Sequence, residues 1–299
     1  MKDNKGSYIA IDWGTTNFRA FLINSSGERL DQVEEPLGLL QIENQQFAES
    51  LEKILSGWIE NYQHLPIYMA GMVGSAQGWV NVPYVETSVT TEKLANAVYS
   101  LPLPWGSTAY IVPGVCHSHS PKRHDVMRGE EVQCFGLRAA IEKNNFTAVF
   151  PGTHSKHIAM TNGELTDFST YMTGELYSIL SQHSILGHSL PKQFESNYAF
   201  DMGVRESKTE NLSHSLFSVR TMRLFDNVKD EHTLNYLSGL LIGYELKELQ
   251  GNHLYIVGNT ELGWRYEYAS ELLSLNSTIV SGDDCFILGM NQIYGVLNA

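Results

Sequence analysis

The segment DWGTTN places an acid, a glycine, two threonines and an amide directly after an apolar run. Glycine lets backbone N–H groups approach phosphate oxygens, and threonine hydroxyls add further donors. An acid at the end of a strand can hold Mg²⁺ through water. Gly14, Thr15, Thr16 and Asn17 are therefore candidates for phosphate binding, and Asp12 is the candidate Mg²⁺ ligand.

A second Gly-Thr pair follows the first by 138 residues, at Gly152 and Thr153. It also stands between two apolar runs, and His154 and Ser155 complete the turn. Two strand-Gly-Thr-strand turns, one in each of two lobes, could hold a polyphosphate from both sides of a shared cleft. A Thr-rich hairpin with an Asp turn initiator is the structural alternative for the first turn taken alone.

These turns need strands on both sides, and the apolar pattern supplies them. In the first part of the chain we expect strands over 8–14, 17–23, 28–35, 66–74 and 108–115, and helices over 46–62 and 92–99. In the second part we expect strands over 147–152, 156–161, 165–170, 253–259 and 277–282, and helices over 128–143, 173–186, 261–273 and 283–297, with further helices between 191 and 250. Both parts thus predict an α/β plan.

Composition narrows the class of protein. The chain has 299 residues, 42% of them apolar, which is enough for two ordinary cores. Its formal charge of −13 argues against nucleic acid and anionic membranes as partners. No apolar run reaches the roughly 18 residues of a membrane span, and MKDNKGS lacks the apolar core of a secretion signal. Three widely spaced cysteines predict reduced thiols, so we expect a cytoplasmic protein.

The polar segment CHSHSPKRHD interrupts this pattern and is the expected surface crossing between the lobes. We place the boundary near Pro121, which gives lobes over 1–120 and 121–299. A metal cluster is one interpretation of Cys116, His117, His119 and His124, but their spacing fits no zinc template, and a crowded polar loop is the simpler one. Motifs of P-loop, Rossmann, zincin and serine hydrolase enzymes are absent from the sequence.

Over nearly its full length the sequence resembles the 2-dehydro-3-deoxygalactonokinases. The resemblance rests on AIDWGTTNFRA, AGMVGSAQGW, DVMRGEEVQ, PGTHSK, MTGELY, LSGLLIG and IVGNTELGWRY, in that order. It implies an actin-like ATPase fold, with two similar ribonuclease H-like lobes flanking a nucleotide cleft. It also implies phosphorylation of 2-dehydro-3-deoxy-D-galactonate at the 6-hydroxyl, with ATP and Mg²⁺, in galactonate catabolism.

The same resemblance assigns roles to the turns. Asp12 and residues 14–17 would form the first phosphate element, and residues 152–155 the second. Gly258, Asn259 and Leu262 would lie at the adenosine. The sequence departs from the pattern in two places. Phe150 and Pro151 stand where many members of the superfamily have an acid, so the metal would rest mainly on Asp12, and His157 stands where the family leads us to expect tryptophan.

The candidate proton acceptor is Glu130, because RGEEVQ is similar to the Gly-Asp-x-Gln stretch that carries the base in related carbohydrate kinases. A carboxylate there need only orient the hydroxyl and accept its proton late. Glu131 and Asp125 are the alternatives. The structural alternative for Glu130 is stabilisation of a helix N-terminus, worth roughly 0.3–1 kcal/mol.

A sugar acid also needs a cation for its carboxylate. Arg128 is the preferred candidate, with Arg19 and Arg205 as alternatives, and each of the three could instead be a surface ion-pair residue. The sugar side of the first lobe would be lined by Asn17, Gly71, Met72, Gly74, Gln77 and Trp79. MVG could equally be a plain strand end.

Two alternatives to this function stay open. The chain could phosphorylate another small sugar acid, such as 2-dehydro-3-deoxygluconate, because phosphate turns say little about the acceptor. It could also be an actin-like ATPase switch, which would hydrolyse ATP slowly without any sugar. A homodimer also stays open, because one sequence does not show the oligomeric state.

Overall fold

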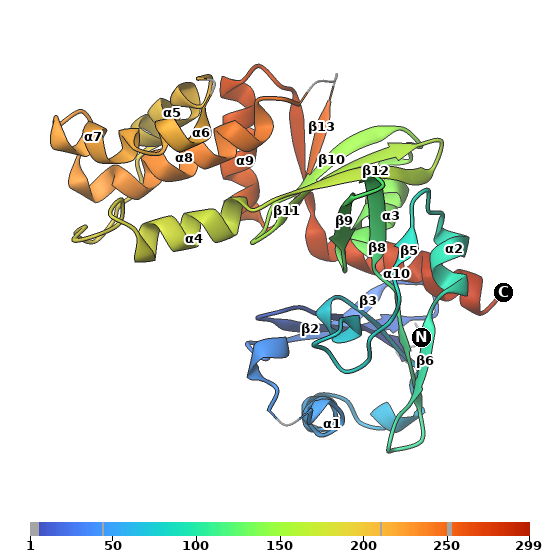
Figure 1. Ribbon diagram of the computed structural model, residues 1–299. Coiled ribbons are helices and arrows are strands. Elements are labelled where there is room, and N and C mark those ends of the chain that lie inside the picture. The colour runs from blue at the N-terminus through green and yellow to red at the C-terminus, as the bar shows by residue number, and fades with distance from the viewer. Residues whose placement is uncertain (1–5, 44, 210, 250–252) are drawn as a thin grey trace. The chain divides into compact units, whose positions relative to one another are not determined.

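The computed structural model describes residues 6–43, 45–209, 211–249 and 253–299. The chain divides into two compact units (Figure 1). Unit 1 comprises Met1–Asn145, Ala159–Phe168 and Gly282–Ala299, and unit 2 comprises Phe146–Ile158 and Ser169–Ser281.

Unit 1 contains a mixed six-stranded sheet in the order β3-β2-β1-β4-β7-β6. Strand β1 pairs antiparallel with β2 and parallel with β4. The strands are β1 (Gly6–Trp13), β2 (Phe18–Asn24), β3 (Arg29–Glu35), β4 (Ile67–Ala70), β6 (Tyr99–Pro102) and β7 (Thr108–Ile111). The helices of this unit are α1 (Phe47–Trp58), α2 (Thr91–Asn96), α3 (Glu130–Ile141) and α10 (Gly282–Leu297), with short 3-10 helices η1 (Leu39–Gln41), η2 (Tyr62–His64) and η3 (Met72–Gly74).

Strand β1 is buried on both faces, and its alternate side chains belong to two different apolar clusters of unit 1. Ile9 and Ile11 join the apolar cluster that includes α1. Tyr8 and Ala10 join the cluster that includes Phe286 and the following apolar residues of α10. Successive side chains of a strand point to opposite faces. The sheet is therefore covered by helices on both faces, and β1 is held rigidly up to the turn that follows it.

A three-stranded sheet, β5-β8-β9, completes unit 1. It contains β5 (Val85–Glu86), β8 (Val115–Ser120) and β9 (Arg123–Met127). The segment CHSHSPKRHD, expected to be the surface crossing between the lobes, forms most of an antiparallel hairpin of β8 and β9 around Pro121. A ribbon with polar side chains on both faces lacks the apolar alternation by which strands are recognised. Helix α3 follows the hairpin and lies in the same unit.

Unit 2 is built on a second mixed sheet in the order β12-β11-β10-β13-β14, of which β10, β13 and β14 run parallel. Its strands are β10 (Phe146–Phe150), β11 (Ser155–Thr161), β12 (Glu164–Tyr171), β13 (Leu254–Gly258) and β14 (Ser277–Ser281). Its helices are α4 (Thr173–His183), α5 (Asn197–Glu206), α6 (Leu212–Ser215), α7 (Ser218–Leu224), α8 (Thr233–Leu246) and α9 (Thr260–Leu272), with the 3-10 helix η4 (Asp230–His232). Residues 159–168 of β11 and β12 belong to unit 1.

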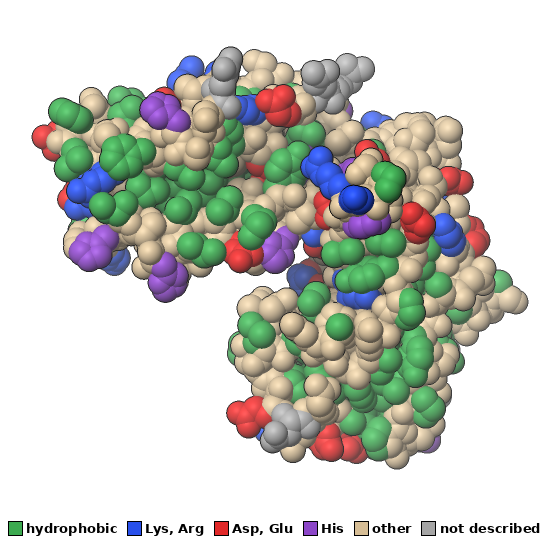
Figure 2. All heavy atoms as spheres, in the orientation of Figure 1, with side chains coloured by type: hydrophobic (Ala, Val, Ile, Leu, Met, Phe, Trp, Pro, Cys, Tyr) green, Lys and Arg blue, Asp and Glu red, His purple; other side chains and the backbone are tan. Residues whose placement is uncertain are grey.

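Helix α8 is buried almost all round because it packs against both the sheet and other helices. Glycines allow its close contact with α5: a Cβ on Gly203 would meet the Tyr236 carbonyl, and one on Gly239 would meet the Phe200 carbonyl. The outer helices leave apolar side chains exposed, and Figure 2 shows such side chains gathered on one face of this helical region. Exposed large apolar residues of the region include Ile179, Tyr198, Phe217, Phe225 and Trp264.

The predicted lobe bounds of 1–120 and 121–299 do not coincide with the two units. The hairpin, α3 and α10 all fall in unit 1. In the described ranges of the chain, no helix combines the length and the apolar character that a membrane crossing requires.

Candidate active site

The first Gly-Thr turn joins β1 to β2 as the sequence predicts. Trp13 and Phe18 are the last paired residues, and the Gly14 N–H donates to the Asn17 carbonyl over 2.9 Å. Thr15, Thr16 and Asn17 are exposed. Short side chains and backbone groups at the end of a rigid strand therefore face solvent, as phosphate binding would require.

Backbone hydrogen bonds from residues 38–40 hold this turn in place. The N–H groups of Gly38, Leu39 and Leu40 donate to the carbonyls of Thr16, Gly14 and Thr15 over 3.0–3.2 Å. Residue 38 must be glycine at this distance, because a Cβ there would collide with the Thr15 and Thr16 backbone. Among the described residues, the N–H groups of positions 15–17 have no hydrogen-bond acceptor. The carbonyls of residues 14–16 thus accept hydrogen bonds from the protein, and the N–H groups of residues 15–17 are available to a ligand.

Asp12 lies beside the turn, with its side chain 16% exposed, and forms an ion pair with Arg19 through Oδ2. Arg19 Nη1 also lies 2.5 Å from Asp283 Oδ1 at the start of α10. Burial lowers the pKa of the Arg19 guanidinium, but the carboxylates of Asp12 and Asp283 raise it overall. With both carboxylates bound, Arg19 orients Asp12. Its predicted contact with a substrate carboxylate would have to break one of these pairs.

Gly71 brings the next predicted residues to Asp12. The expected strand over 66–74 ends at Ala70, because Gly71 has a left-handed φ of +93° and η3 follows it. A Cβ on Gly71 would lie 2.8 Å from the Trp13 carbonyl oxygen and 3.2 Å from Asp12 Oδ1. A Cβ on Gly129 would in turn lie 3.5 Å from Gly71 Cα. Asp12, Gly71 and the start of α3 therefore form one contact series within unit 1.

Arg128 is 8% exposed and lies next to this series. Its Nη2 donates to the Val82 carbonyl over 2.8 Å, and its Cζ lies 4.4 Å from the centre of the Tyr84 ring. Its Nε and Nη1 have no hydrogen-bond partner among the described residues, and a Cβ on Gly74 would lie 3.0 Å from Nη1. Burial raises the pKa of the nearby Glu131 carboxyl and outweighs the charge of Arg128, which acts to lower it. Unbonded nitrogens of a buried guanidinium are costly. The two unbonded nitrogens are therefore available to donate hydrogen bonds to an anionic ligand.

Two acids begin α3, and their environments differ. The Arg128 N–H donates to Glu130 Oε2 over 3.2 Å, and the Gly129 N–H donates to Glu131 Oε2 over 2.7 Å. Glu130 is half-buried, whereas Glu131 is fully buried. Burial, followed by the charge of Glu130, raises the pKa of Glu131 to about 8. Of the two, only Glu130 presents its carboxylate near the surface.

The other predicted sugar-side residues have packing roles. Trp79 stacks on Phe47 with ring centres 5.9 Å apart and meets Trp13 edge-on at 6.5 Å. Met72 is half-buried against the same core, and Gln77 is exposed. Asp125 lies in the hairpin, where its Oδ2 is 3.8 Å from His119 Nε2. The predicted contacts of these residues with a sugar remain predictions.

The second Gly-Thr turn lies in unit 2, between β10 and β11. The Glu175 N–H donates to the Thr153 carbonyl over 3.0 Å, and His154 forms an ion pair with Glu175. A Cβ on Gly174 would collide with the Gly152 carbonyl, so α4 begins directly against the turn. Thr153 and His154 are exposed. The Thr153 carbonyl thus ties this turn to the start of α4.

A buried network below this turn was missed by the sequence analysis. Glu245 of α8, 3% exposed, accepts hydrogen bonds from Ser155 Oγ at 2.6 Å and from Tyr266 OH at 2.7 Å. His157 Nε2 lies 2.9 Å from Glu245 Oε1, and its ring lies 4.3 Å from that of Tyr171. Burial, together with Glu245, raises the pKa of Tyr266 well above its usual value. Ser155 thus anchors the turn, and His157 fills a polar site where the family pattern leads us to expect tryptophan.

The predicted adenosine element lies at the same sheet edge as the second turn. Strands β10 and β13 are parallel neighbours, and a Cβ on Gly258 would lie 3.8 Å from Pro151 Cδ. Asn259 caps α9, because its side chain accepts the Leu262 N–H over 2.9 Å. Ligands of α/β sheets bind outside the carboxyl ends of the strands. Unit 2 therefore brings residues 152–155 and 258–262 to the same edge of its sheet.

Comparison with protein families shows to which family the chain belongs. The model of the 2-keto-3-deoxy-galactonokinase family matches residues 12–293. The chain belongs to this family. The matched range begins at Asp12 and includes both turns, the start of α3 and the segment 258–262.

Relatives of the family match along nearly their whole length. The chain is 35% identical to the 2-dehydro-3-deoxygalactonokinase of Escherichia coli (strain K12), covering 96% of this chain and 97% of the relative. It is 32% identical to a probable 2-dehydro-3-deoxygalactonokinase, DgoK1, of Rhizobium meliloti (strain 1021), with 96% of each chain covered. The resemblance described from the sequence is thereby confirmed.

Solved structures confirm the fold class. A proposed 2-dehydro-3-deoxygalactonokinase from Sinorhizobium meliloti superposes with a TM-score of 0.87 at 30% identity, covering 96% of this chain and 97% of that chain. The activator of the 2-hydroxyisocaproyl-CoA dehydratase from Clostridium difficile, with bound ADPNP, superposes with a TM-score of 0.51 at 11% identity over 97% and 96% of the two chains. The second likeness shows the fold alone. The chain is a mixed α/β protein with two mixed sheets, as the actin-like expectation requires.

Proposed function

We propose that this chain transfers the γ-phosphoryl group of ATP to the 6-hydroxyl of 2-dehydro-3-deoxy-D-galactonate, a step of galactonate catabolism. The observation that carries the proposal is the family match over residues 12–293, together with 35% identity to a curated relative named for this activity. The geometry supports it independently, because the described residues place an acid, exposed turn donors and a buried arginine with two unbonded nitrogens in one unit.

In this proposal both Gly-Thr turns bind phosphates, and Gly258, Asn259 and Leu262 bind the adenosine. Support comes from the hydrogen bonds to the carbonyls of residues 14–16 in the first turn and to the Thr153 carbonyl in the second, with exposed residues at each tip. Phosphoryl transfer depends mostly on positioning and on neutralising charge, so backbone donors held by rigid strands suit the task.

Asp12 is the proposed residue for Mg²⁺. Its Oδ2 is bound to Arg19, while its Oδ1 faces the backbone at Gly71. Mg²⁺ keeps several waters and takes one or two carboxylates besides phosphate oxygens, so the remaining oxygen of Asp12 fits such an ion. When bound, the ion would supply charge neutralisation at the phosphates. Arg19 would keep the carboxylate ionised and fixed in orientation.

Arg128 is the proposed contact for the substrate carboxylate. The support is its burial, with two guanidinium nitrogens that lack partners among the described residues. An arginine fork matches a carboxylate in a bidentate manner. Arg205 lacks these features, because it is exposed and paired with Asp201 one helical turn away.

Glu130 is the proposed proton acceptor. It stands two residues from Arg128, and its carboxylate is half-buried rather than fully buried. Glu131 is less suited, because it is fully buried and holds its proton up to a pKa of about 8. Asp125 is also less suited, since it lies in the hairpin near His119.

The test is coupled ADP release with 2-dehydro-3-deoxygalactonate, with its gluconate epimer and with no sugar. We expect turnover to depend on the sugar acid and to be fastest with the galactonate form. Equal rates on both epimers would widen the substrate class. Slow hydrolysis that no sugar changes would contradict the kinase and favour an ATPase switch.

The cytoplasm is the proposed location, because ATP is supplied there and Cys116, Cys134 and Cys285 are free thiols. We retain a homodimer as a prediction, and sedimentation of the purified chain would test it.

A further inference from the structure

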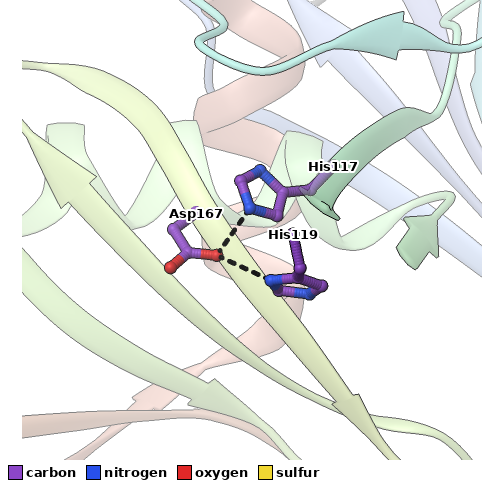
Figure 3. Close-up of side chains that lie close together, drawn as sticks. All are labelled: His117, His119 and Asp167. Atoms are coloured by element: carbon purple, nitrogen blue, oxygen red, sulfur yellow. Dashed lines mark ion pairs between the residues drawn. The ribbon is translucent and has the colours of Figure 1, made fainter. Parts of the chain in front are cut away.

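Three side chains of unit 1 form a cluster apart from the residues proposed for the kinase. His117 and His119 extend from β8, and Asp167 extends from β12 toward them (Figure 3). His117 Nε2 lies 3.2 Å from Asp167 Oδ1, and His119 Nδ1 lies 3.8 Å from the same oxygen. Their three ligand atoms all lie within 4.8 Å of one another.

The strands explain why these side chains meet. His117 and His119 are two residues apart on one strand and therefore share a face, whereas Cys116 points to the other face. Strand β12 is held beside them by the bridge between Val89 and Leu165, whose two N–H···O bonds measure 2.9 and 3.0 Å. Asp167 lies two residues beyond Leu165. The cluster is thus positioned by backbone pairing.

His117 also forms a hydrogen bond outside the cluster, whereas the outer nitrogen of His119 forms none among the described residues. Thr87 Oγ1 lies 2.7 Å from His117 Nδ1. In the tautomer in which Nδ1 donates to this hydroxyl, the Nε2 lone pair is directed to the cluster. His119 has the opposite arrangement: its Nδ1 faces Asp167, and its buried Nε2 lies 3.8 Å from Asp125 Oδ2. Metal-binding histidines commonly donate a hydrogen bond from the second ring nitrogen. Thr87 offers His117 such a partner, whereas Asp125 is too far from His119 Nε2 for a hydrogen bond.

We propose that His117, His119 and Asp167 bind a divalent transition-metal ion, with Zn²⁺ as the preferred ion. Ligands of tetrahedral Zn²⁺ lie about 3.3 Å from one another at the usual bond lengths. The two distances to Asp167 Oδ1, 3.2 and 3.8 Å, are close to that value, and all three ligand atoms lie within 4.8 Å of one another. Side-chain movements that bring the ring nitrogens to the same spacing would complete the site. Two imidazoles and one carboxylate favour Zn²⁺ over Mg²⁺ or Ca²⁺, which prefer oxygen ligands.

The ligand set differs from the one that the sequence suggested. His124 is exposed on β9 and bonds Ser118 Oγ over 2.9 Å through its Nδ1, so it does not enter the cluster. Asp167, which supplies the third ligand, is remote in the sequence. Its side chain is 58% exposed, which leaves a coordination position open to water. A bound ion would link β8 to β12 within unit 1.

The experiment is calorimetric titration of the metal-stripped full chain with Zn²⁺ in a buffer containing Mg²⁺, followed by Co²⁺ absorption. We expect about one Zn²⁺ per chain and a visible spectrum typical of tetrahedral Co²⁺. Asp167→Asn and His117→Asn should each weaken Zn²⁺ binding by at least about tenfold. His124→Asn is the matched control and should bind as the unmodified chain does.

The variants are compared by circular dichroism, and Asp167→Asn, at an exposed position, tests the proposal even if a histidine variant fails to fold. Zn²⁺ should raise the melting temperature of the unmodified chain and of His124→Asn more than that of Asp167→Asn. The proposal is overturned if the unmodified chain binds no Zn²⁺, or if Asp167→Asn binds it as tightly as the control does.

Discussion

At the residue scale, Asp12 carries the strongest prediction. Asp12→Asn removes the charge that Arg19 holds in place and that a phosphate-bound ion would need. We expect kcat to fall by roughly 100-fold or more, because charge neutralisation dominates phosphoryl transfer. The melting temperature should change little, because the ion pair is partly exposed.

Asp283→Asn is the matched control for this experiment. It breaks the other ion pair of Arg19 and leaves Asp12 unchanged. We expect its kcat to stay within about threefold of the unmodified value, in line with the small energy of a partly exposed ion pair. A near-normal rate for Asp12→Asn would remove Asp12 from the mechanism.

Arg128 is predicted to act on the sugar acid and not on ATP. Arg128→Lys keeps a charge but loses the planar fork, so the KM for the sugar acid should rise by roughly 10–100-fold while the KM for ATP is unchanged. Arg205→Lys, at an exposed i,i+4 ion pair, is the control and should behave normally. Steady-state kinetics in both substrates measures the difference. Equal changes in both KM values would point to a structural role.

Glu131 should make stability depend on pH. The folded chain keeps this carboxyl protonated up to a pKa of about 8, whereas its ordinary value is 4.5. Between these values the unfolded chain binds fewer protons, so the free energy of unfolding falls as pH rises. The loss from pH 5 to pH 8 amounts to roughly 4 kcal/mol at most.

Glu131→Gln should remove this slope, and Glu142→Gln, at the exposed end of the same helix, should keep it. Denaturant unfolding at several pH values measures both. An unchanged slope in Glu131→Gln would show that the carboxyl is ionised in the folded chain.

At the scale of elements, substitution of Gly71 tests whether the contacts of Asp12, Gly71 and the start of α3 are needed for activity. Gly71→Ala places a Cβ 2.8 Å from the Trp13 carbonyl oxygen, whereas Gly106→Ala, with a similar φ of +98°, meets no atom within 4 Å. Both variants should lose about 1 kcal/mol from the left-handed backbone. Only Gly71→Ala should lose more stability than this. Its kcat/KM should also fall, because the added Cβ forces Asp12 to shift. Equal losses in the two variants would contradict this account.

The two Gly-Thr turns could be predicted because their signal is local: each lies between apolar strands that are adjacent in the sequence. The hairpin at 115–127 could not, because its polar strands lack apolar alternation. Glu245 and Asp283 were missed for another reason. Each meets its partners across long stretches of chain, and nothing near either residue in the sequence marks it as buried or paired.

At the scale of the whole molecule, the α/β class was predictable from alternating strands and helices, but the membership of each unit was not. Helix α10 belongs to unit 1 because Phe286, Met290 and Ile293 pack against the face of β1 that carries Tyr8 and Ala10. Periodicity shows that a helix has an apolar face, yet it does not show which sheet that face covers. The choice is made by packing between distant residues.

The most direct test of the proposed activity is ³¹P nuclear magnetic resonance of the reaction products. The full chain is incubated with ATP, Mg²⁺ and 2-dehydro-3-deoxygalactonate. We predict a new phosphomonoester signal coupled to the two protons of the terminal carbon, formed in step with ADP. Inorganic phosphate alone, released at the same rate with and without the sugar acid, would contradict the account.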